Sequence, residues 1–339
     1  MSVSILVWGA GAIGGTIGAH LARAGQQVGF VDRVNDHVAA INASGLRITG
    51  PVREFVARAP AWRPAELKGS FGTVLLCVKA QDTEAATQAI LPLLDDDGCI
   101  VSVQNGLNEQ VIARIAGRER TVGAFVNFGA DWIGPGEVQF GGRGAVVVGE
   151  IDGRVTPRAE RLHALFKLFD DRAVLTTNIW GYLWGKLAYG AMLFATALTD
   201  ESMADCFAAA DQRPLFMALA REILAVADRV GVRPESFDGF DPTAYATDQG
   251  AAASLDALER HNRHSAKSHS GIWRDLAVRK RRTEADAQLG PIVTAAQEHG
   301  VGAPITARLI TMIHEIEDGQ RDRAWSNLQE LAQVIPAVR

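Results

Sequence analysis

The first half of the chain alternates short apolar runs with segments of helical periodicity. Runs rich in branched apolar residues predict strands at 4–8, 27–31, 73–78, 100–103 and 121–124. Apolar positions spaced three to four residues apart predict a helix over 12–23, which Gly25 would end. Strands that alternate with helices are typical of βαβ units, so we expect an α/β Rossmann domain with a doubly wound, mainly parallel sheet. A glycine-containing stretch at 137–150 predicts an antiparallel hairpin that completes this domain.

After about Thr176 the β-rich runs stop and helical patterns take over. Helices are predicted at 180–198, 214–230, 276–299, 306–318 and 324–334, with Gly231 and Gly300 as C-terminal stops. The stretch 233–249, rich in Pro, Asp, Gly and Phe, predicts an excursion between two helices. We therefore expect two domains. Residues 1–175 would form an NAD(P)-binding Rossmann domain, and residues 176–339 an all-α C-terminal domain for substrate binding or dimerisation.

Composition narrows the class of protein. A length of 339 residues suits two domains, and the net charge of −5 disfavours a nucleic-acid-binding protein. The three cysteines (Cys77, Cys99 and Cys206) show no CxxC or metal-ligand spacing, which favours a reducing compartment. The N-terminus lacks the pattern of a signal peptide, and the longest apolar stretch of the second half, 187–198, is too short to span a bilayer. We expect a cytoplasmic protein that binds neither membrane nor nucleic acid.

A glycine fingerprint lies between the first predicted strand and the first predicted helix. It consists of Gly9, Ala10, Gly11, Ala12, Ile13 and Gly14. In such a motif the first glycine permits a tight turn, the second lets the backbone approach a pyrophosphate, and the third lets helix and strand pack closely. The phosphates lie on the N-terminus of the helix. The sequence therefore predicts a binding site for NAD or NADP.

The end of the second predicted strand carries opposing signals about which dinucleotide binds. Asp32 lies where an acidic residue would accept hydrogen bonds from the ribose hydroxyls and so favour NAD. Arg33, the next residue, could instead pair with the 2′-phosphate of NADP. Since a carboxylate at the strand tip repels a phosphate, we lean slightly to NAD, while Arg33 keeps NADP open.

Lys186 is a lone cation in a segment, 180–190, otherwise made of aromatic, glycine and small apolar residues. A buried ammonium is costly unless it is paired, and such groups gather where chemistry requires a perturbed pKa. The alternative is a surface lysine whose aliphatic stem packs over Trp180 and Trp184.

Four motifs, taken in order, resemble the ketopantoate reductase (2-dehydropantoate 2-reductase) family. They are the glycine fingerprint, the strand end at 76–81 with Lys79, the segment 104–107 with Asn105, and the pairing of 184–187 with the later segment 281–284. Their order and rough spacing match the family over essentially the whole chain. The resemblance implies a Rossmann domain followed by a helical domain, and NAD(P)H-dependent reduction of a 2-oxo acid to an (R)-2-hydroxy acid.

The resemblance also implies roles for individual residues. Lys186 would be the general acid that protonates the carbonyl oxygen, and Glu284 would contact the substrate hydroxyl and the cofactor. Asn105 would lie near nicotinamide and substrate, and Lys79 near a cofactor ribose. These roles agree with elementary chemistry, because hydride addition develops negative charge on oxygen and a lysine in apolar surroundings becomes a better proton donor near neutral pH. The family needs no metal, and we interpret the three histidines at 261, 264 and 269 as surface residues.

The chain departs from the family beside Lys186. The family usually has asparagines four and eight residues further on, whereas this chain has Gly190 and Phe194. Residues at these spacings share a helix face, so both replacements fall where polar groups of a substrate would bind. We expect a substrate bulkier or less polar than ketopantoate. Its carboxylate would bind a serine upstream of Glu284, for which Ser270 is preferred over Ser268.

Two alternatives to a reductase remain. One is an NAD-dependent (R)-2-hydroxy acid dehydrogenase that works oxidatively on an aromatic or branched acid. The other is a non-catalytic dinucleotide-binding sensor, against which the presence of both Lys186 and Glu284 argues. In each enzyme hypothesis the partner is a small 2-oxo or 2-hydroxy acid, and the helical domain could also form a homodimer.

Overall fold

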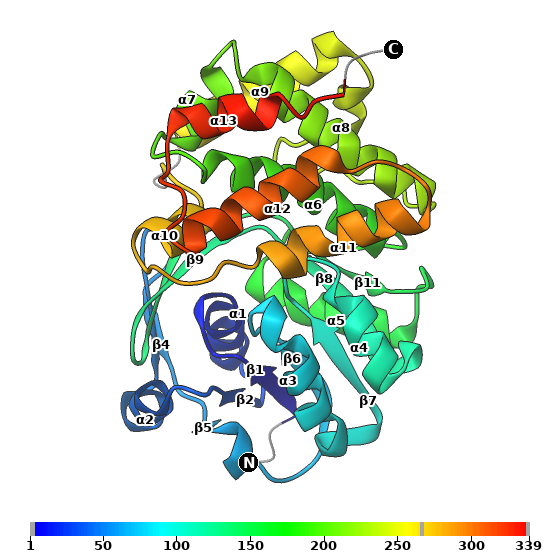
Figure 1. Ribbon diagram of the computed structural model, residues 1–339. Helices are drawn as coiled ribbons and strands as arrows, with labels where there is room; N and C mark the ends of the chain where they lie inside the picture. Colours follow the sequence, from blue (N-terminus) through cyan, green and yellow to red (C-terminus); the bar gives the residue numbers. More distant parts are fainter. Residues whose placement is uncertain (1–3, 265–267, 337–339) are drawn as a thin grey trace. The chain divides into compact units, whose positions relative to one another are not determined.

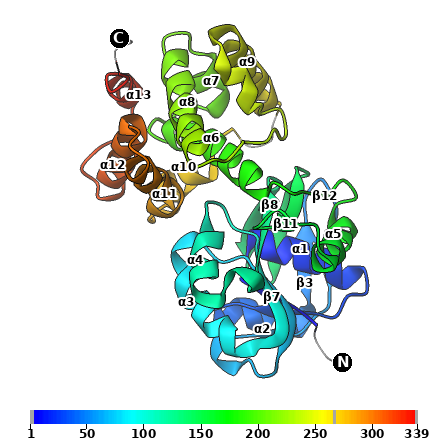
Figure 2. The ribbon, with the colours of Figure 1, turned by 90° about the vertical axis from the view of Figure 1, so that its right-hand side faces the viewer.

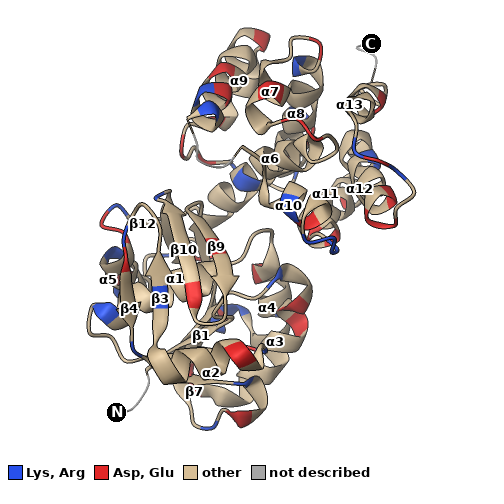
Figure 3. Ribbon diagram, turned by 90° about the vertical axis from the view of Figure 1, so that its left-hand side faces the viewer, with Lys and Arg blue, Asp and Glu red and all other residues tan. Residues whose placement is uncertain are grey.

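The computed structural model describes residues 4–264 and 268–336 and divides the chain into two compact units, Met1–Ile179 and Trp180–Arg339. Within the described residues every named strand lies in the first unit, whereas the second is helical apart from one isolated bridge between Phe237 and Phe240. No helix of the described residues is long and apolar enough to cross a membrane. Acidic and basic positions are interspersed over both units rather than gathered by sign (Figure 3).

The first unit is built on an eight-stranded sheet in the order β12-β11-β8-β7-β6-β1-β2-β5. From β5 to β8 all neighbours are parallel, whereas β11 is antiparallel to β8 and β12 is parallel to β11. The chain moves from β1 to β2 on one side and then crosses to β6 on the other, so the strand order reverses beside β1. In doubly wound sheets ligands bind at such a reversal, outside the carboxyl ends of the strands. The strands are β1 (Ile5–Trp8), β2 (Val28–Val31), β5 (Ala61–Trp62), β6 (Phe71–Leu76), β7 (Leu94–Ser102), β8 (Thr121–Val126), β11 (Val146–Glu150) and β12 (Val174–Leu175).

Apolar side chains on both faces of this sheet explain why helices cover both. In β1, Ile5 and Val7 belong to one buried cluster, whereas Leu6 and Trp8 belong to another. The first cluster includes side chains from α1 (Ala12–Arg23) and α5 (Pro157–Phe169), and the second includes side chains from α3 (Thr83–Ile90) and α4 (Asn108–Ala116). These four helices are labelled in Figure 1. Period-2 alternation in a strand with apolar residues at every position predicts this arrangement.

A second, four-stranded sheet packs near α1, in the order β4-β3-β10-β9. Its strands are β3 (Leu46–Thr49), β4 (Phe55–Ala57), β9 (Gly129–Gly134) and β10 (Glu137–Gly142). The predicted hairpin at 137–150 is therefore wrong, because β10 pairs with β9 and β3 while β11 pairs with β8 in the large sheet. The chain changes sheets near Gly144, where a Cβ would lie 2.4 Å from the carbonyl oxygen of Asn127. The antiparallel hairpin of this region is β9–β10, which turns at Gly136 with φ 73°.

The second unit consists of helices (Figures 1 and 2). They are α6 (Ile179–Thr196), which begins at the last residue of the first unit, α7 (Met203–Ala208), α8 (Arg213–Arg229), α9 (Asp248–Arg263), α10 (Gly271–Ala277), α11 (Ala285–Glu298), α12 (Pro304–Glu317) and α13 (Trp325–Ala332). The remaining helix of the first unit is α2 (Asn35–Ser44), and short 3-10 turns are η1 (Pro64–Glu66), η2 (Ala80–Asp82), η3 (Leu91–Leu93), η4 (Arg118–Arg120) and η5 (Pro242–Ala246).

Most predicted elements are confirmed with shifted ends, and the predicted fold class is confirmed. The five predicted strands correspond to β1, β2, β6, β7 and β8, and the predicted helix at 12–23 coincides with α1. The predicted helix at 276–299 is confirmed only from Ala285 onward as α11, because α10 ends at Ala277 and the chain passes through Lys280 with φ 47° before α11 begins. Neither α7 nor α9 was predicted. Gly231 and Gly300 follow helices with φ of 75° and 67°, as C-terminal glycines do.

Candidate active site

The glycine fingerprint forms the turn between β1 and α1, and each glycine has a different surrounding. Gly9 has φ 101°, and a Cβ there would lie 2.9 Å from the backbone of Cys77 and Val78, just past the end of β6. A Cβ on Gly14 would lie 2.1 Å from the carbonyl oxygen of Gly9 and 2.8 Å from the Cβ of Cys77. A Cβ on Gly11 would meet nothing within 4 Å. The turn thus has open space at the N-terminus of α1, the place where the glycine fingerprint predicts a pyrophosphate.

His37 supports this turn from α2, a role that no motif in the sequence predicted. The Gly136 N–H donates to its Nδ1 at 2.9 Å, so the proton lies on Nε2, which donates to the Ala10 carbonyl oxygen at 2.9 Å. The imidazole is buried, with 1% of its surface exposed. It therefore ties the glycine turn to the hairpin of the second sheet.

Asp32 and Arg33 both have partners within the first unit. The Asp32 carboxylate accepts from the backbone N–H of Ala10 at 2.9 Å and from that of Val34 at 3.0 Å. Arg33 is largely exposed and forms an ion pair with Asp82 at 3.2 Å. Asp32 is thereby fixed beside the glycine turn, and the Arg33 guanidinium is already paired with a carboxylate.

Lys79 and Asn105 are exposed residues that follow β6 and β7, and a chain of hydrogen bonds joins their two loops. Gln104 donates to the Val78 carbonyl oxygen at 2.9 Å and to the Thr83 hydroxyl at 2.8 Å. The hydroxyl donates to the Asn108 side chain at 2.9 Å, and the Asn108 amide donates to the Asn105 carbonyl oxygen at 2.7 Å. The sequence did not single out these connecting residues, because their contacts depend on two strands being neighbours.

Lys186 is half-buried on one face of α6, and the opposite face of the helix is fully buried. The half-exposed residues of this part of the helix are Tyr182, Lys186, Tyr189, Gly190 and Leu193, whereas Trp184 and Leu187 are 2% and 3% exposed. Burial lowers the pKa of Lys186 to about 8, and the carboxylates of Asp238 and Glu284 oppose that effect. A solvated lysine stays charged to much higher pH, so this amine can donate or accept a proton near neutrality.

The segment before α11 positions Glu284. The backbone N–H and the hydroxyl of Thr283 donate to Glu317 at 2.7 and 2.8 Å, and Arg282 pairs with the same carboxylate at 2.9 Å. Glu317 belongs to the last turn of α12 and its side chain is 3% exposed. Glu284 itself is the N-cap residue of α11. Within the second unit, the carboxylates of Asp238 and Glu284 both act electrostatically on Lys186, the residue that the sequence pairs with Glu284.

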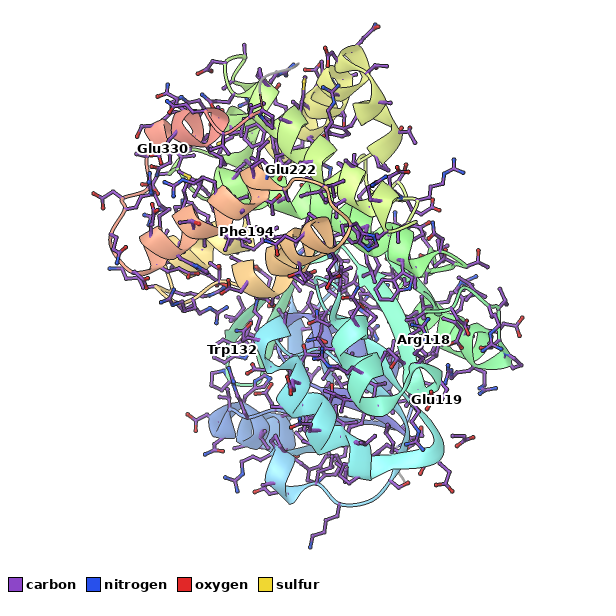
Figure 4. All side chains as sticks on the ribbon, turned by 45° about the vertical axis from the view of Figure 1, so that its right-hand side comes forward. Arg118, Glu119, Trp132, Phe194, Glu222 and Glu330 are labelled. Carbon is purple, nitrogen blue, oxygen red and sulfur yellow. The ribbon has the colours of Figure 1, made fainter. Side chains whose placement is uncertain are left out.

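Gly190 and Phe194, the two positions on α6 that the sequence predicts to face a substrate, differ in their surroundings. A Cβ on Gly190 would meet nothing within 4 Å, so this position is open. Phe194 is fully buried, at 0% exposure, whereas its neighbour Leu193 is half-buried. Figure 4 labels Phe194 within the helical unit. Each residue turns about 100° around the helix axis. Leu193, seven residues after Lys186, therefore lies within about 20° of it around the axis, whereas Phe194, eight residues after it, lies about 80° away. Helical periodicity could have pointed to Leu193 as the accessible apolar residue.

Ser270 is buried against the same helix. Its hydroxyl accepts from the Trp273 N–H at 3.1 Å as the N-cap of α10 and lies 3.5 Å from the Leu193 carbonyl oxygen, to which it donates. Ser268 is exposed and hydrogen-bonds to His269 at 2.8 Å. Of the two serines, Ser270 is therefore the one that contacts α6.

Two family models match the chain, one in each half. The model described as ketopantoate reductase PanE/ApbA matches residues 5–153, and the model of its C-terminal part matches residues 178–317. The chain belongs to the ketopantoate reductase family. Curated relatives agree. A 2-dehydropantoate 2-reductase of Archaeoglobus fulgidus is 28% identical over 317 residues, covering 93% of this chain and 98% of the relative. One from Mesorhizobium japonicum is 30% identical over 256 residues, covering 68% and 78%.

Solved structures share this fold. A ketopantoate reductase of the PanE/ApbA family from Ralstonia eutropha is 27% identical with a TM-score of 0.79, covering 94% of this chain and 99% of that chain. A D-mandelate dehydrogenase solved with NADH and anilino(oxo)acetate is 22% identical with a TM-score of 0.82 over the same shares. The predicted family is confirmed, as is the class of enzyme, an NAD(P)-dependent oxidoreductase that acts on CH–OH groups.

Proposed function

We propose that this chain reduces a 2-oxo acid to an (R)-2-hydroxy acid, with the Rossmann unit (predicted as 1–175) holding the dinucleotide and the helical unit (predicted as 176–339) supplying the proton and binding the substrate. The observation that carries the proposal is the placement of Lys186, the one charged residue of the otherwise apolar helix α6, half-buried on its partly exposed face. Burial lowers the pKa of this amine to about 8, and the carboxylates of Asp238 and Glu284 oppose that effect. Glycine spacing at 9–14, with open space at Gly11, supports the cofactor assignment.

The residues of the Rossmann unit would hold the dinucleotide in the following way. Gly9, Gly11 and Gly14, with Ala10, Ala12 and Ile13 between them, would present the N-terminus of α1 to the pyrophosphate. Lys79 would lie near a ribose, and Asn105 near the nicotinamide and the substrate. The bound dinucleotide supplies the hydride that reduces the carbonyl carbon.

Lys186 would act on the carbonyl oxygen of the substrate. Its ammonium stabilises the negative charge that develops there and transfers a proton to it, so the product leaves as a hydroxyl. With a pKa of about 8, the ammonium form predominates at pH 7 and is lost above pH 8. Glu284 would accept a hydrogen bond from the new hydroxyl, and Ser270 would be the serine nearest to the substrate carboxylate.

The contacts of Asp32 and Arg33 support a preference for NAD over NADP. A 2′-phosphate would have to approach the Asp32 carboxylate, which two backbone N–H groups hold in place. It would also compete with Asp82 for Arg33. Ribose hydroxyls face neither obstacle, since a carboxylate accepts hydrogen bonds from them.

The surface beside Lys186 supports a substrate larger or less polar than ketopantoate. Gly190 leaves open space and offers no side-chain hydrogen bond, and Leu193 adds apolar surface. Phe194, the other position predicted to bind substrate, is fully buried, so Leu193 rather than Phe194 would present apolar surface to a substrate. A site without polar partners for substrate hydroxyls does not favour a dihydroxylated substrate.

A second candidate is the same chemistry in the oxidative direction, on an aromatic or branched 2-hydroxy acid. The lowered pKa of Lys186 favours it, because the neutral amine that accepts a proton becomes the major form above about pH 8.

The test is a panel of 2-oxo acids with NADH and NADPH, followed by the absorbance of the reduced cofactor. Phenylglyoxylate, 2-oxoisovalerate and ketopantoate cover the aromatic, branched and dihydroxylated classes, and the matching (R)-2-hydroxy acids with NAD and NADP test the reverse direction. We expect turnover of a bulky acid to exceed that of ketopantoate. No turnover of any acid, together with tight dinucleotide binding, would instead identify a non-catalytic sensor.

A further inference from the structure

A tight turn at 237–240 carries an acidic residue that the sequence did not single out. The Phe237 N–H donates to the Phe240 carbonyl oxygen at 3.0 Å, and the Phe240 N–H donates back at 2.7 Å. Between them Asp238 and Gly239 both have left-handed backbones, with φ of 41° and 85°. Two consecutive positive φ values are those of a type I′ turn, for which Asp-Gly is a preferred pair. The turn therefore has one defined conformation, with Asp238 at its tip.

The turn is docked on the part of α6 that carries Lys186. The Glu235 N–H donates to the Gly181 carbonyl oxygen at 3.0 Å. A Cβ on Gly185 would lie 2.7 Å from the Glu235 carbonyl oxygen and 3.5 Å from the Phe237 ring, so only glycine permits this approach. The ring centroids of Phe237 and Phe240 lie 6.2 and 5.9 Å from that of Tyr189. These contacts bracket Lys186 on both sides along the helix.

Among the described residues, two carboxylates act on the Lys186 amine: Asp238 from the turn and Glu284 from the N-terminus of α11, of which Asp238 has the larger effect. Burial raises the pKa of Tyr189 on the same helix, and the Asp238 carboxylate adds to that rise. Burial also raises the pKa of Tyr182, to which Glu235 contributes. Burial acts against the ammonium, so a nearby negative charge decides how much of the amine stays protonated.

We propose that Asp238 is a positioning residue for Lys186, whose ammonium it keeps charged through the docked turn. The effect of Asp238 on turnover rests on the proposed function. Its effect on the charge of Lys186 is a property of the folded chain alone. Removing the carboxylate would leave the Lys186 amine neutral over a wider pH range and deprive the site of its proton donor at mildly alkaline pH.

The decisive variant is Asp238→Asn, because asparagine tolerates the left-handed backbone and Asn-Gly also favours the type I′ turn. Asp241→Asn is the matched control. It removes an acidic residue three positions away that caps η5 through the Thr243 N–H at 2.9 Å, and its amide oxygen can still accept that bond. Circular dichroism and thermal unfolding establish that each variant is folded.

The first measurement is the titration of Lys186 itself. The lysines are methylated reductively with ¹³C-formaldehyde, and the Lys186 resonance is identified by its absence in Lys186→Arg. We expect the midpoint to fall by about half a pH unit or more in Asp238→Asn, a typical size for a charge pair near a protein surface, and to stay unchanged in Asp241→Asn. A midpoint that does not move in Asp238→Asn would overturn the inference, whatever the activity.

The second measurement is the pH dependence of kcat with phenylglyoxylate, or with the best substrate of the panel. The alkaline decline should move to lower pH in Asp238→Asn by the same amount as the titration, with KM at pH 6 little changed. Asp238→Glu should restore it in part. If Lys186→Ala retains turnover with the same alkaline decline, the proposed function fails, and the titration still decides the role of Asp238.

Discussion

Exchanging the two residues that follow Lys186 at one and two helical turns should separate a substrate contact from a core residue. Gly190→Asn places an amide in open space, since a Cβ there meets nothing within 4 Å. Glycine inside a helix costs about 1 kcal/mol relative to alanine, and asparagine costs less, so this variant should be as stable as the wild type or slightly more stable. Phe194→Asn should behave in the opposite way.

The Phe194 ring is fully buried, and its loss leaves a cavity that an amide cannot fill. Removing a buried phenylalanine costs about 3–5 kcal/mol, and a buried amide without partners adds about 1–3 kcal/mol. Such a sum is comparable to the whole stability of a typical domain, about 5–15 kcal/mol. Phe194→Asn should therefore unfold, or unfold at far lower urea concentration, when followed by circular dichroism.

The activity assay is kcat/KM for ketopantoate relative to phenylglyoxylate. One new hydrogen bond is worth about 0.5–1.5 kcal/mol, so Gly190→Asn should raise this ratio by roughly two- to tenfold. Gly190→Ala is the matched control, since it fills the same space without an amide and should leave ketopantoate no better. The reasoning is refuted if Phe194→Asn is within about 1 kcal/mol of the wild type, or if Gly190→Asn and Gly190→Ala give the same ratio.

Two further variants test the roles of Lys186 and Asp32, and a third tests the buried carboxyl of Glu109 in α4. Lys186→Ala should lower kcat about 10²–10³-fold while the dinucleotide Kd, measured by fluorescence, stays near the wild-type value; equal losses in both would place Lys186 outside the chemistry. Asp32→Asn keeps an acceptor for the Ala10 N–H but removes the charge, so the ratio of kcat/KM for NADPH to that for NADH should rise, and an unchanged ratio would count against this ribose contact. Burial raises the pKa of Glu109 to about 8, so the folded state retains a proton that the unfolded state releases, and stability is lost as the pH rises from about 4.5 to 8. Glu109→Gln should therefore stabilise the protein by roughly 3 kcal/mol at pH 7 and by little at pH 4, and an equal effect at both pH values in urea unfolding would contradict this reasoning.

The parts of the fold that the sequence predicted depend on local pattern. The helix at 12–23 follows from apolar spacing and from glycines on either side, and the structure places α1 at the same residues. The predicted strands were found because their apolar runs are continuous, as expected for a sheet covered on both faces. The pairing of the stretch 137–150 was beyond such reasoning, because either of its strands could satisfy its hydrogen bonds with several partners.

The sequence by itself determined the family, the glycine turn and the two candidate residues Lys186 and Glu284, because each depends on a short motif whose chemistry is local. Only the tertiary structure decided which face of α6 is covered. As a result, Leu193 is partly exposed, whereas Phe194 is fully buried. Only the tertiary structure docked the turn that carries Asp238 on the part of α6 that carries Lys186. Helical periodicity defines faces but not their neighbours, and the turn docks where Gly185 lets another backbone approach. That contact joins residues distant in sequence, and no local propensity encodes it.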